Sequence, residues 1–594
     1  MIKKNFRYRP TGLVPTLVLS TGLLSCVAQA AEFRIGELEG SFDSQLSVGA
    51  SWRLEDANSD FISPGNGGTN PTNGANNDDG NLNFEKGDTF SKIFKGVHDL
   101  ELNYQNYGAF VRGKYWYDFE LEDEKRPHGH SANGFASGDQ LNDDGFNDFA
   151  QFSGAEFLDA FVYGAFDIGE MPLDVRLGRQ VVSWGESTFI RGGINAINPV
   201  DVTAFRRPGA EIKEGLLPVN MLYGNLGLTE SLNVEAFYQL QFEQTVIDGC
   251  GTLFSVNDFA PEGCNLINVA PAALSLSDSA ALANGFTVAR DANGVREADD
   301  DGQFGVALRY LSEALNDTEF GLYYLNYHSR LPVLAANKAG TNPVNAPFIP
   351  NDPFGTNPTY FSLYPEDIQL LGLSFATNVD EWAVSGEISH RKDVPVSING
   401  TTFVQAMLTA GTPNENPQNP VNDLVNAAGA GEVVNAYLLY DVTQAQLTGI
   451  RTFTGILGAS TVALVGEVGT THVHSLHSTI PHGRAGTFGP GVASDDGFVT
   501  TNSWGYRVRA KADYNDVFSG INLRPGIAFS HDVDGFAPQP GGAFQEGRKA
   551  LGLSLTADYL NKYSANISYT NFFGGDFNLN EDKDFIAASM SVSF

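Results

Sequence analysis

The sequence predicts an all-β protein, a transmembrane antiparallel β-barrel of about 18 strands. Three observations predict this fold. Apolar and polar residues alternate over stretches long enough for tilted membrane strands, which need about 9 to 11 residues, whereas strands of soluble proteins average about five or six. Short and long connectors take turns along the chain. The chain also ends on an alternating segment whose last residue is Phe594.

The N-terminal segment 1–30 has the composition of a cleaved export signal. Four basic residues precede an apolar stretch from Leu13 to Val27, and Ala28-Gln29-Ala30 is an A-x-A cleavage motif. We expect cleavage after Ala30. A lipoprotein signal ending at Cys26 is the rival interpretation, although the bulky Leu24 stands where a small residue is usual.

Two cysteines, Cys250 and Cys264, remain after the signal. An exported chain folds in an oxidising compartment, so we expect them to form a disulfide. Closing so short a loop stabilises a fold by about 3 kcal/mol. Neither a C-x-x-C pair nor a Cys/His metal spacing is present, so a structural staple is preferred to a redox role.

The alternation is clearest in four stretches, taken in chain order. Gln45–Leu54, Ala109–Glu120 and Ser503–Tyr514 place apolar residues at every second position and polar or charged residues between them. The stretch 586–594 does the same up to the last residue, as in the C-terminal aromatic strand that guides barrel assembly. After Ala30 no run of about 18 apolar residues occurs, which excludes a helical membrane bundle.

The connectors predict one barrel domain over residues 31–594. Short turns are expected at Gln105–Gly108, Gly169–Pro172, Leu228–Ser231, Ala314–Thr318, Asn378–Glu381, Asp516–Ser519 and Asn561–Ser564. Long polar segments are expected at 55–96, 121–154, 181–216, 243–302, 329–366, 392–440, 471–502, 532–548 and 574–583. Short periplasmic turns and long extracellular loops are typical of outer-membrane barrels. A hairpin near Ala459 has to be assumed, so 16 strands would also satisfy the pattern.

Composition excludes other classes. The chain has 594 residues, of which 42% are hydrophobic, with 42 Phe and 21 Tyr, so it is not a disordered acidic protein. Acidic residues number 70 against 36 basic ones, a formal charge of −34, which argues against nucleic-acid binding. The predicted location is the outer membrane of a Gram-negative bacterium.

The alternation also predicts which charged residues face the lumen, because a charge facing lipid at the membrane midplane costs about 2–4 kcal/mol. The predicted lumen cations are Arg53, Arg112, Lys114, Arg176, Arg309, Arg391, Arg507, Arg509, Lys511 and Arg524. The predicted lumen acids are Asp118, Glu120, Glu235, Glu387, Glu467 and Asp513. We expect most of them to form ion pairs, and the others to give a weakly anion-preferring path.

Segment 181–216 differs in composition from the Asn/Gly/Asp-rich loops. Its candidate site residues are Trp184, Glu186, Arg191, Asn195, Asn198, Arg206, Arg207, Glu211, Lys213 and Glu214. A loop folded inward narrows a wide barrel, and opposed charges on it then select solutes. The hypothesis is that this segment forms the constriction or plug. The alternative is an ordered extracellular loop held by surface ion pairs.

Six segments carry a family resemblance: Asp78–Phe84, Gly87–Ser91, Tyr104–Glu120, Gly178–Glu186, Phe205–Leu217 and Tyr364–Ile368. Together they resemble the proteobacterial domain-of-unknown-function family numbered 1302. The resemblance implies an outer-membrane barrel that transports hydrophobic compounds beside a periplasmic lipid-carrier-like protein and a resistance-nodulation-division type pump. It implies no catalytic residues. A weaker likeness to fatty-acid-type outer-membrane channels rests on Tyr364–Ile368 and the alternation.

No motif of a serine hydrolase, zinc protease or nucleotide-binding loop occurs. The acidic turns 77–80, 142–145 and 299–302 suit calcium or the divalent-ion layer on lipopolysaccharide, and solvated turns are the alternative. No other cofactor is expected. The histidines His472, His474, His477 and His482 suit a transition metal or are unpaired surface residues. A short helix is expected at Phe403–Leu408.

Three functions remain open. The first is a conduit for hydrophobic or amphipathic, lipid-like compounds, working alone or with a periplasmic lipid carrier and an inner-membrane pump. A general or weakly anion-preferring porin is the alternative form of transport. The second is a loop-mediated receptor or structural barrel without transport. A barrel enzyme is the third class, and the absence of its motifs argues against it. The other expected partners are outer-membrane lipid and lipopolysaccharide.

Overall fold

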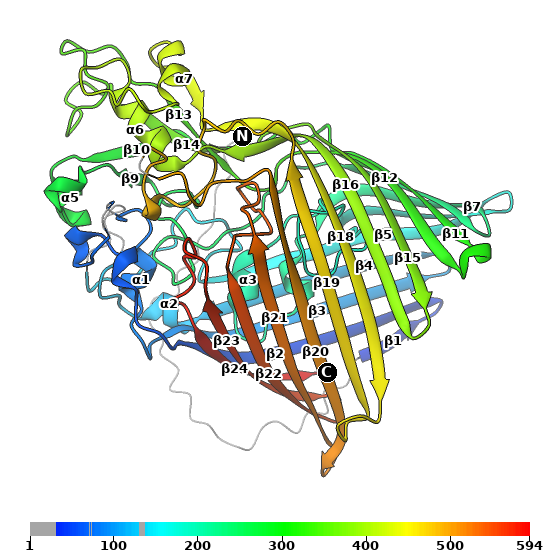
Figure 1. The fold of residues 1–594 in the computed structure, drawn as a ribbon. Coiled ribbons are helices and arrows are strands. Elements are labelled where there is room, and N and C mark those ends of the chain that lie inside the picture. Colours follow the sequence, from blue (N-terminus) through cyan, green and yellow to red (C-terminus); the bar gives the residue numbers. More distant parts are fainter. Residues whose placement is uncertain (1–30, 71, 73, 130–136, 493) are drawn as a thin grey trace.

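A computed structural model describes residues 31–594 except 71, 73, 130–136 and 493. The expected signal peptide lies outside the described residues, so cleavage after Ala30 stays a prediction. Within the described part, 18 antiparallel strands form one closed barrel (Figure 1), as the connectors predicted. The barrel closes where the last strand pairs with the first, from Arg53 opposite Phe585 to Gln45 opposite Ser593.

Each barrel strand pairs with its sequence neighbours in the wall. The barrel strands are β2 (Leu38–Arg53), β3 (Thr89–Tyr104), β4 (Tyr107–Asp118), β5 (Ser153–Ile168), β6 (Met171–Gln180), β7 (Val219–Thr229), β8 (Leu232–Gln239), β11 (Phe304–Ser312), β12 (Thr318–Tyr327), β15 (Ile368–Val379), β16 (Trp382–Ser397), β18 (Tyr437–Thr454), β19 (Thr461–Val473), β20 (Asn502–Phe518), β21 (Ile521–Asp534), β22 (Lys549–Tyr559), β23 (Tyr563–Phe573) and β24 (Phe585–Ser593). A short strand β1 (Ala31–Ile35) pairs with the start of β2.

The outer surface of the barrel is apolar. Alternate residues of the strands are large, hydrophobic and exposed, including Val48 (52%), Leu371 (54%), Ile527 (48%) and Met590 (64%). A soluble protein does not leave so many apolar side chains on one continuous surface, so lipid must cover them. The chain is therefore an outer-membrane protein of the Gram-negative type, as predicted. None of the described helices is long and apolar enough to cross a membrane.

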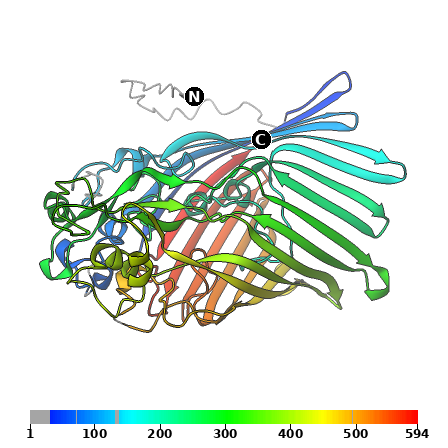
Figure 2. The same ribbon diagram turned by 90° about the horizontal axis from the view of Figure 1, so that it is seen from above.

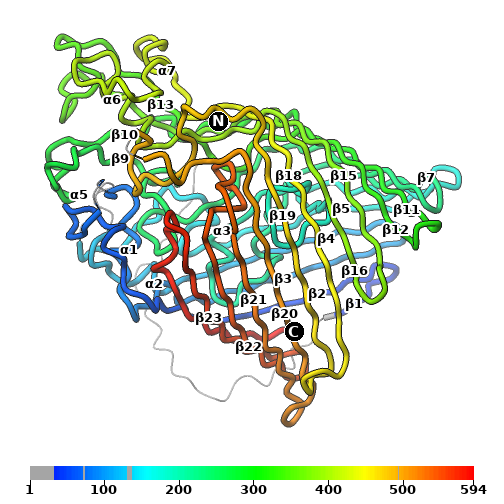
Figure 3. The backbone as a smooth tube through the Cα atoms, in the orientation of Figure 1, coloured from blue at the N-terminus to red at the C-terminus, as the bar shows by residue number. Residues whose placement is uncertain are grey.

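The two ends of the barrel differ (Figure 2). At one end the strands are joined by tight turns, such as Gly169-Glu170, where Gly169 has φ +68°. Exposed aromatic residues gather beside these turns: Tyr104, Tyr107, Phe166, Tyr310, Tyr559 and Tyr563. Aromatic residues mark the membrane interface of outer-membrane barrels, and their short turns are periplasmic. The other end, which carries the long connectors, is extracellular (Figure 3).

The extracellular loops form a second small sheet over that end (Figure 1). Its strands are β9 (Leu266–Asn268), β10 (Thr287–Arg296), β13 (Val333–Asn337), β14 (Thr359–Leu363) and β17 (Val433–Asn435). The short helices are α1 (Asp79–Asn83), α2 (Phe119–Asp123), α3 (Val202–Arg206), α4 (Ile212–Gly215), α5 (Asp278–Ala283), α6 (Gly400–Thr409) and α7 (Asn422–Ala427), with 3-10 turns at Ser59–Phe61, Pro64–Asn66, Ala272–Leu274, Glu313–Leu315 and Gly486–Phe488.

Segments 243–302, 329–366 and 392–440 are long connectors, as the sequence predicted. Apolar residues from all three pack into a shared core. That core includes Phe403 and Met407 of α6, the helix expected at Phe403–Leu408, which extends over Gly400–Thr409. The structure contains the disulfide between Cys250 and Cys264 within the first of these loops.

Two predicted strand ends also move. The first barrel strand starts at Leu38 instead of Gln45. Residues 38–44 continue the pairing with β3 beyond the point where the pairing with the last strand, β24, ends. The strand expected to reach Glu120 ends at Asp118, whose side chain accepts backbone N–H bonds from Glu120 and Leu121 and so starts α2.

Candidate channel lumen and constriction

Segment 181–216 leaves the extracellular end of β6 and folds along the inside of the barrel. Its first half contacts inward-facing side chains of β8, β16 and β19. Its second half contacts β2, where Glu211 accepts a hydrogen bond of 2.7 Å from Gln45. Gln45 pairs with Ser593 at the end of the last strand, so the segment reaches almost to the periplasmic end. In Figure 1, α3 is seen behind β21, within the ring of strands.

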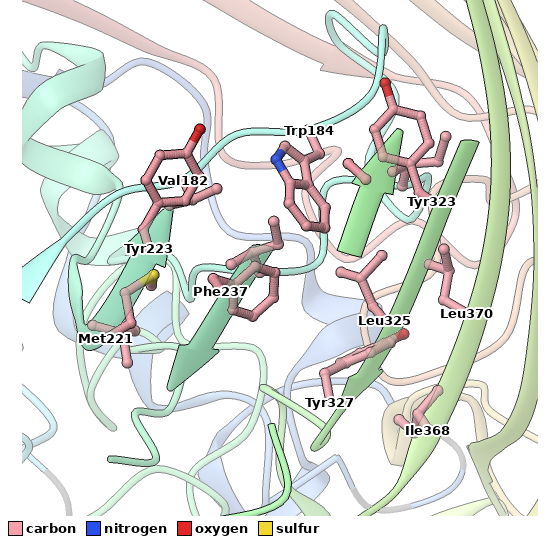
Figure 4. Packing of buried hydrophobic residues seen from close by; sticks show 14 residues of the cluster. Val182, Trp184, Met221, Tyr223, Phe237, Tyr323, Leu325, Tyr327, Ile368 and Leu370 are labelled. Atoms are coloured by element: carbon pink, nitrogen blue, oxygen red, sulfur yellow. The ribbon is translucent and has the colours of Figure 1, made fainter. Parts of the chain in front are cut away.

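An apolar anchor fixes the start of the segment. The Trp184 side chain is 1% exposed, with its ring centroid 5.1 Å from that of Phe237 and 5.9 Å from that of Tyr323 (Figure 4). Its indole N–H donates to Glu235 of β8 at 2.7 Å. Ile194 and Ile197 of the segment belong to the same buried cluster. The wall from β7 to β15 is therefore covered from inside by a packed core.

Two inward carboxylates hold the backbone of the segment. Glu467 of β19 accepts N–H bonds from Thr188, Phe189 and Ile190 at 2.8, 2.7 and 2.7 Å. Glu387 of β16 accepts N–H bonds from residues 186, 187 and 194 at 2.5, 3.1 and 2.9 Å. Hydrogen bonds to an ionised acceptor are the strong ones, so these contacts fix the segment to the wall.

Two buried ion pairs fix the other half of the segment. Lys95 of β3 meets Glu214 at 2.6 Å, and Lys114 of β4 meets Asp201 at 3.0 Å, with both partners of each pair almost fully buried. Lys95 also donates to the Gly209 carbonyl. Removing one partner of such a pair leaves an uncompensated buried charge, which costs more than the pair itself contributes.

The predicted constriction residues divide into two groups. Arg191 and Asn195 are exposed on the segment, with Arg191 donating to the Gly542 carbonyl at 3.1 Å. Asn198 is structural, since its amide bonds to backbone groups at 180, 182 and 217 and closes the base of the segment. Glu214 is structural through Lys95, and Lys213 pairs with Glu211 at 3.1 Å.

The segment also exposes apolar side chains. Phe189 is 37% exposed, Phe205 is 44% exposed and Ile212 is 72% exposed. Residues at this degree of exposure inside a barrel contribute apolar surface to the path, and the sequence analysis did not single them out.

Most predicted lumen cations have acidic partners. Arg112 pairs with Asp99 and Asp159, Arg309 with Glu235 and Glu319, Arg507 with Asp532, and Arg524 with Asp513 and Asp558. Arg53 is buried against Asp582 and the carbonyls of residues 81 and 84. Arg176 lies over the ring of Tyr223, and Arg391 reaches Gln444.

Two cations on β20 differ from the rest. Arg509 and Lys511 are exposed, and neither forms an ion pair or hydrogen bond with any described residue. They alternate with the lipid-facing Val508, so they point inward. The residues beside them in the register are small or polar: Ala528 and Gly526 on β21, Gly552 and Ser554 on β22, and Thr570 and Ser568 on β23. This wall is therefore open, polar and basic.

A pocket lies at the extracellular mouth, between the ends of β3 and β4, the helix α3 and loop 248–254. The lining residues are Phe90, Ser91, Asp118, Leu121, Ala150, Gln151, Phe152, Thr203, Arg206, Arg207, Asp248, Gly249, Thr252, Leu253 and Phe254. The set combines apolar side chains, three of them Phe, with polar ones that include the two predicted constriction arginines.

The two arginines of the pocket are held in different ways. The guanidinium carbon of Arg206 lies 4.2 Å from the ring centre of Phe254, and its Nε is 3.7 Å from Asp248 without a hydrogen-bond partner in the described chain. Arg207 lies over the ring of Trp116 and donates to the Phe149 carbonyl at 2.8 Å. Arg206 therefore has fewer hydrogen-bond partners among the described residues than Arg207.

The histidines and acidic turns that the sequence offered as metal ligands lie in different surroundings. The rings of His472 and His474 are 4.5 Å apart and bond to Asn502 and Thr443, whereas His482 bonds to the Tyr440 hydroxyl. Turns 142–145 and 299–302 lie largely at the surface. Only the first acidic turn, 77–80, is buried among other carboxylates.

The chain is similar to one protein family and to several solved structures. The family described as protein of unknown function (DUF1302) matches residues 12–594. No curated protein matches the chain. Among solved structures, OccAB1 of Acinetobacter baumannii has a TM-score of 0.40 at 10% identity, covering 95% of this chain and 98% of that one. OccK2 (OpdF) of Pseudomonas aeruginosa has 0.37 at 9%, covering 93% and 97%. The outer membrane protein OpdK of the same species has 0.37 at 9%, covering 93% and 98%.

Proposed function

This chain belongs to the DUF1302 family, and we propose that it is an outer-membrane channel for amphipathic, lipid-like molecules that carry an acidic group. The barrel itself is of the channel type. The observation that carries the proposal is the mouth pocket, which joins an apolar lining to Arg206. Ligand sites combine apolar side chains with a few placed polar groups, and the pocket places Phe90, Phe152 and Phe254 beside Arg206.

The chemistry of the pocket suits an acid with an apolar tail. Phe90, Phe152 and Phe254 would cover the tail, while the Arg206 guanidinium would bind the carboxylate. Asp248 is the competing anion, and burial raises the pKa of its carboxyl group. An incoming carboxylate therefore meets an arginine whose one acidic neighbour is 3.7 Å away and poorly solvated.

The lumen on the periplasmic side of the pocket also combines apolar surface with basic groups. Phe205 and Ile212 expose apolar surface on the segment, and Arg509 and Lys511 stand on the polar wall. A molecule with one apolar and one anionic part can use both sides, whereas a neutral hydrocarbon can use only the first.

The proposed partners follow from the need for an energy source when transport runs against a concentration gradient. A passive channel cannot move lipid-like molecules against a gradient, so we propose that a periplasmic lipid carrier and a resistance-nodulation-division type pump work with it. Outer-membrane lipid and lipopolysaccharide surround the barrel. The role is transport, and no catalytic function is proposed.

The test is binding and uptake with purified protein in liposomes. Dodecanoate should bind and cross, dodecanol should bind roughly tenfold more weakly because it lacks the charge-assisted bond, and Arg206→Gln with Arg207→Gln should remove that preference. Glu230→Gln, on an exposed periplasmic turn, is the matched control. Equal transport of acid and alcohol by the wild type would refute the proposal.

A weakly anion-preferring porin is the second candidate, favoured by Arg509 and Lys511. The two functions separate in a salt gradient across a planar bilayer. Arg509→Gln with Lys511→Gln should abolish anion preference in either case. If dodecanoate transport is unchanged in this variant and in Arg206→Gln with Arg207→Gln, the hypothesis of an anion-preferring porin replaces that of a channel for lipid-like acids.

A further inference from the structure

Four aspartates from two extracellular loops meet in the interior of the layer that the extracellular loops form over the barrel, called the cap below. Asp78 and Asp79 begin α1, and Asp258 and Asp278 come from the loop between β8 and β10. Their exposed fractions are 0%, 2%, 4% and 5%. His128, from the loop between β4 and β5, contacts Asp79 at 3.0 Å and Asp278 at 3.3 Å.

The carboxylates converge on common points. One oxygen each of Asp78, Asp79 and Asp258 lies within 4.8 Å of the others, and Asp79, Asp278 and His128 form a second such group. Oxygen ligands lie about 2.3–2.6 Å from a calcium ion, so two ligands of one ion can stand up to about 5 Å apart. The first group has the spacing of oxygens around one cation.

The second observation is an unused acceptor. Oδ2 of Asp78 accepts bonds from the Ser63 N–H at 2.9 Å and from Asn66 at 3.1 Å. Its Oδ1 is fully buried and has no hydrogen-bond partner among the described residues, although it belongs to a side chain aimed into the group. A buried carboxylate oxygen without a donor is costly unless a cation supplies the missing contact.

We propose that Asp78, Asp79 and Asp258 bind a calcium ion, with Asp278 and His128 beside it. The three carboxylates are oxygen ligands, which a hard cation prefers, and a loop-built site tolerates the irregular geometry of calcium better than the strict octahedron of magnesium. Asn66 donates to both Asp78 and Asp278, and Asn268 donates to Asp278, so amides orient the carboxylates from behind.

The ion would tie together three loops that roof the mouth. Asn77 on the first loop donates to the Val256 carbonyl, and Asn83 donates to the carbonyls of Gly129 and Gly251. Loop 248–254 lines the mouth pocket, so the ion would stabilise one wall of it. The calcium site does not depend on what the channel carries.

The test is calcium binding by the full-length protein in detergent, after removal of bound ions with a chelator. Isothermal titration should give one site per chain with a dissociation constant of about 10⁻⁴ M or tighter, as in extracellular calcium modules. Calcium should also slow proteolysis of loops 55–88 and 243–302. Asp78→Asn and Asp258→Asn should each weaken binding by roughly tenfold to a hundredfold.

The control is Asp301→Asn in the exposed turn 299–302, which should bind calcium as the wild type does. Heat-modifiable migration in gels reports whether each variant forms the barrel. Absence of calcium binding by a folded wild type, or equal affinity in Asp78→Asn, Asp258→Asn and the control, would overturn the proposal. The proposal would also be overturned if the protein bound zinc tightly but not calcium, and if His128→Gln lost that zinc binding. The ion would then belong to the group of Asp79, Asp278 and His128.

Discussion

Replacing Glu467 with alanine should detach the inward segment from the barrel wall. This carboxylate accepts three consecutive backbone N–H bonds, from Thr188, Phe189 and Ile190. No other described group accepts these donors. The variant therefore either leaves three N–H groups unpaired against the wall or lets this part of the segment move to water.

The magnitude follows from the donors. A hydrogen bond to a charged acceptor contributes about 1.5–3 kcal/mol. The bond from Ile190 is buried and the other two are part-buried, so the total loss is about 3 kcal/mol. At about 1.4 kcal/mol per factor of ten, the population of the detached segment should rise about 100-fold. Glu467→Gln keeps one carbonyl acceptor, so its effect should be intermediate.

Single-channel recording in planar bilayers measures that population. The wild type should show a low-conductance state with rare larger openings, and Glu467→Ala should occupy the larger state about 100 times as often. Glu230→Ala, on the exposed turn between β7 and β8, should behave as the wild type. Glu387, which holds the neighbouring turn, remains in place and should limit the detachment to residues 188–190.

The reasoning fails if Glu467→Ala assembles normally and its conductance and open-state occupancy equal those of the control. That result would mean that the three hydrogen bonds do not decide the position of the segment. The apolar anchor around Trp184 would then be sufficient by itself.

Three further predictions concern other parts of the molecule. Arg509→Gln with Lys511→Gln should shift the reversal potential in a potassium chloride gradient toward cations, while either single change should have a smaller effect. Burial lowers the pKa of His482 to about 4 from 6.5; the unfolded cap then binds its proton first, so cap stability should fall by about 3 kcal/mol as pH drops from 6.5 to 4, which proteolysis at pH 7 and 4.5 would detect and His482→Gln should reduce. Cys250→Ser should cost loop 243–302 about 3 kcal/mol of stability, seen as faster cleavage of that loop than in the wild type.

The sequence predicted the barrel well because lipid imposes a simple rule. Every strand residue faces either lipid or lumen, so one alternation reports both fold and orientation. Ser503–Tyr514 lies within β20 and Ile586 to Phe594 spans β24, with Val508 and Met590 exposed as the pattern required. The same alternation predicts from strand position alone that Glu235, Glu387 and Glu467 face inward.

The extracellular sheet could not be predicted in the same way. Its strands are three to ten residues long and pair across large sequence distances, as β17 does with β13 and β10 with β14. No membrane constrains their alternation, and short strands carry little periodicity. The binding partners of Glu387 and Glu467 were hidden for a related reason, since they are backbone N–H groups, which leave no signal in residue type.

The position of the inward segment explains how an acidic protein can present a basic path. The whole chain has a formal charge of −34, yet inside the barrel Glu235, Glu387 and Glu467 are consumed by bonds to the segment. Lys95 and Lys114 are consumed in the same way by Glu214 and Asp201. The segment thus satisfies both acids and bases of the barrel wall, and we propose that the cations left on the opposite wall, Arg509 and Lys511, set the sign of the field there. Net charge is therefore no guide to the preference of this channel, and detaching the segment should weaken anion preference as it exposes the three carboxylates.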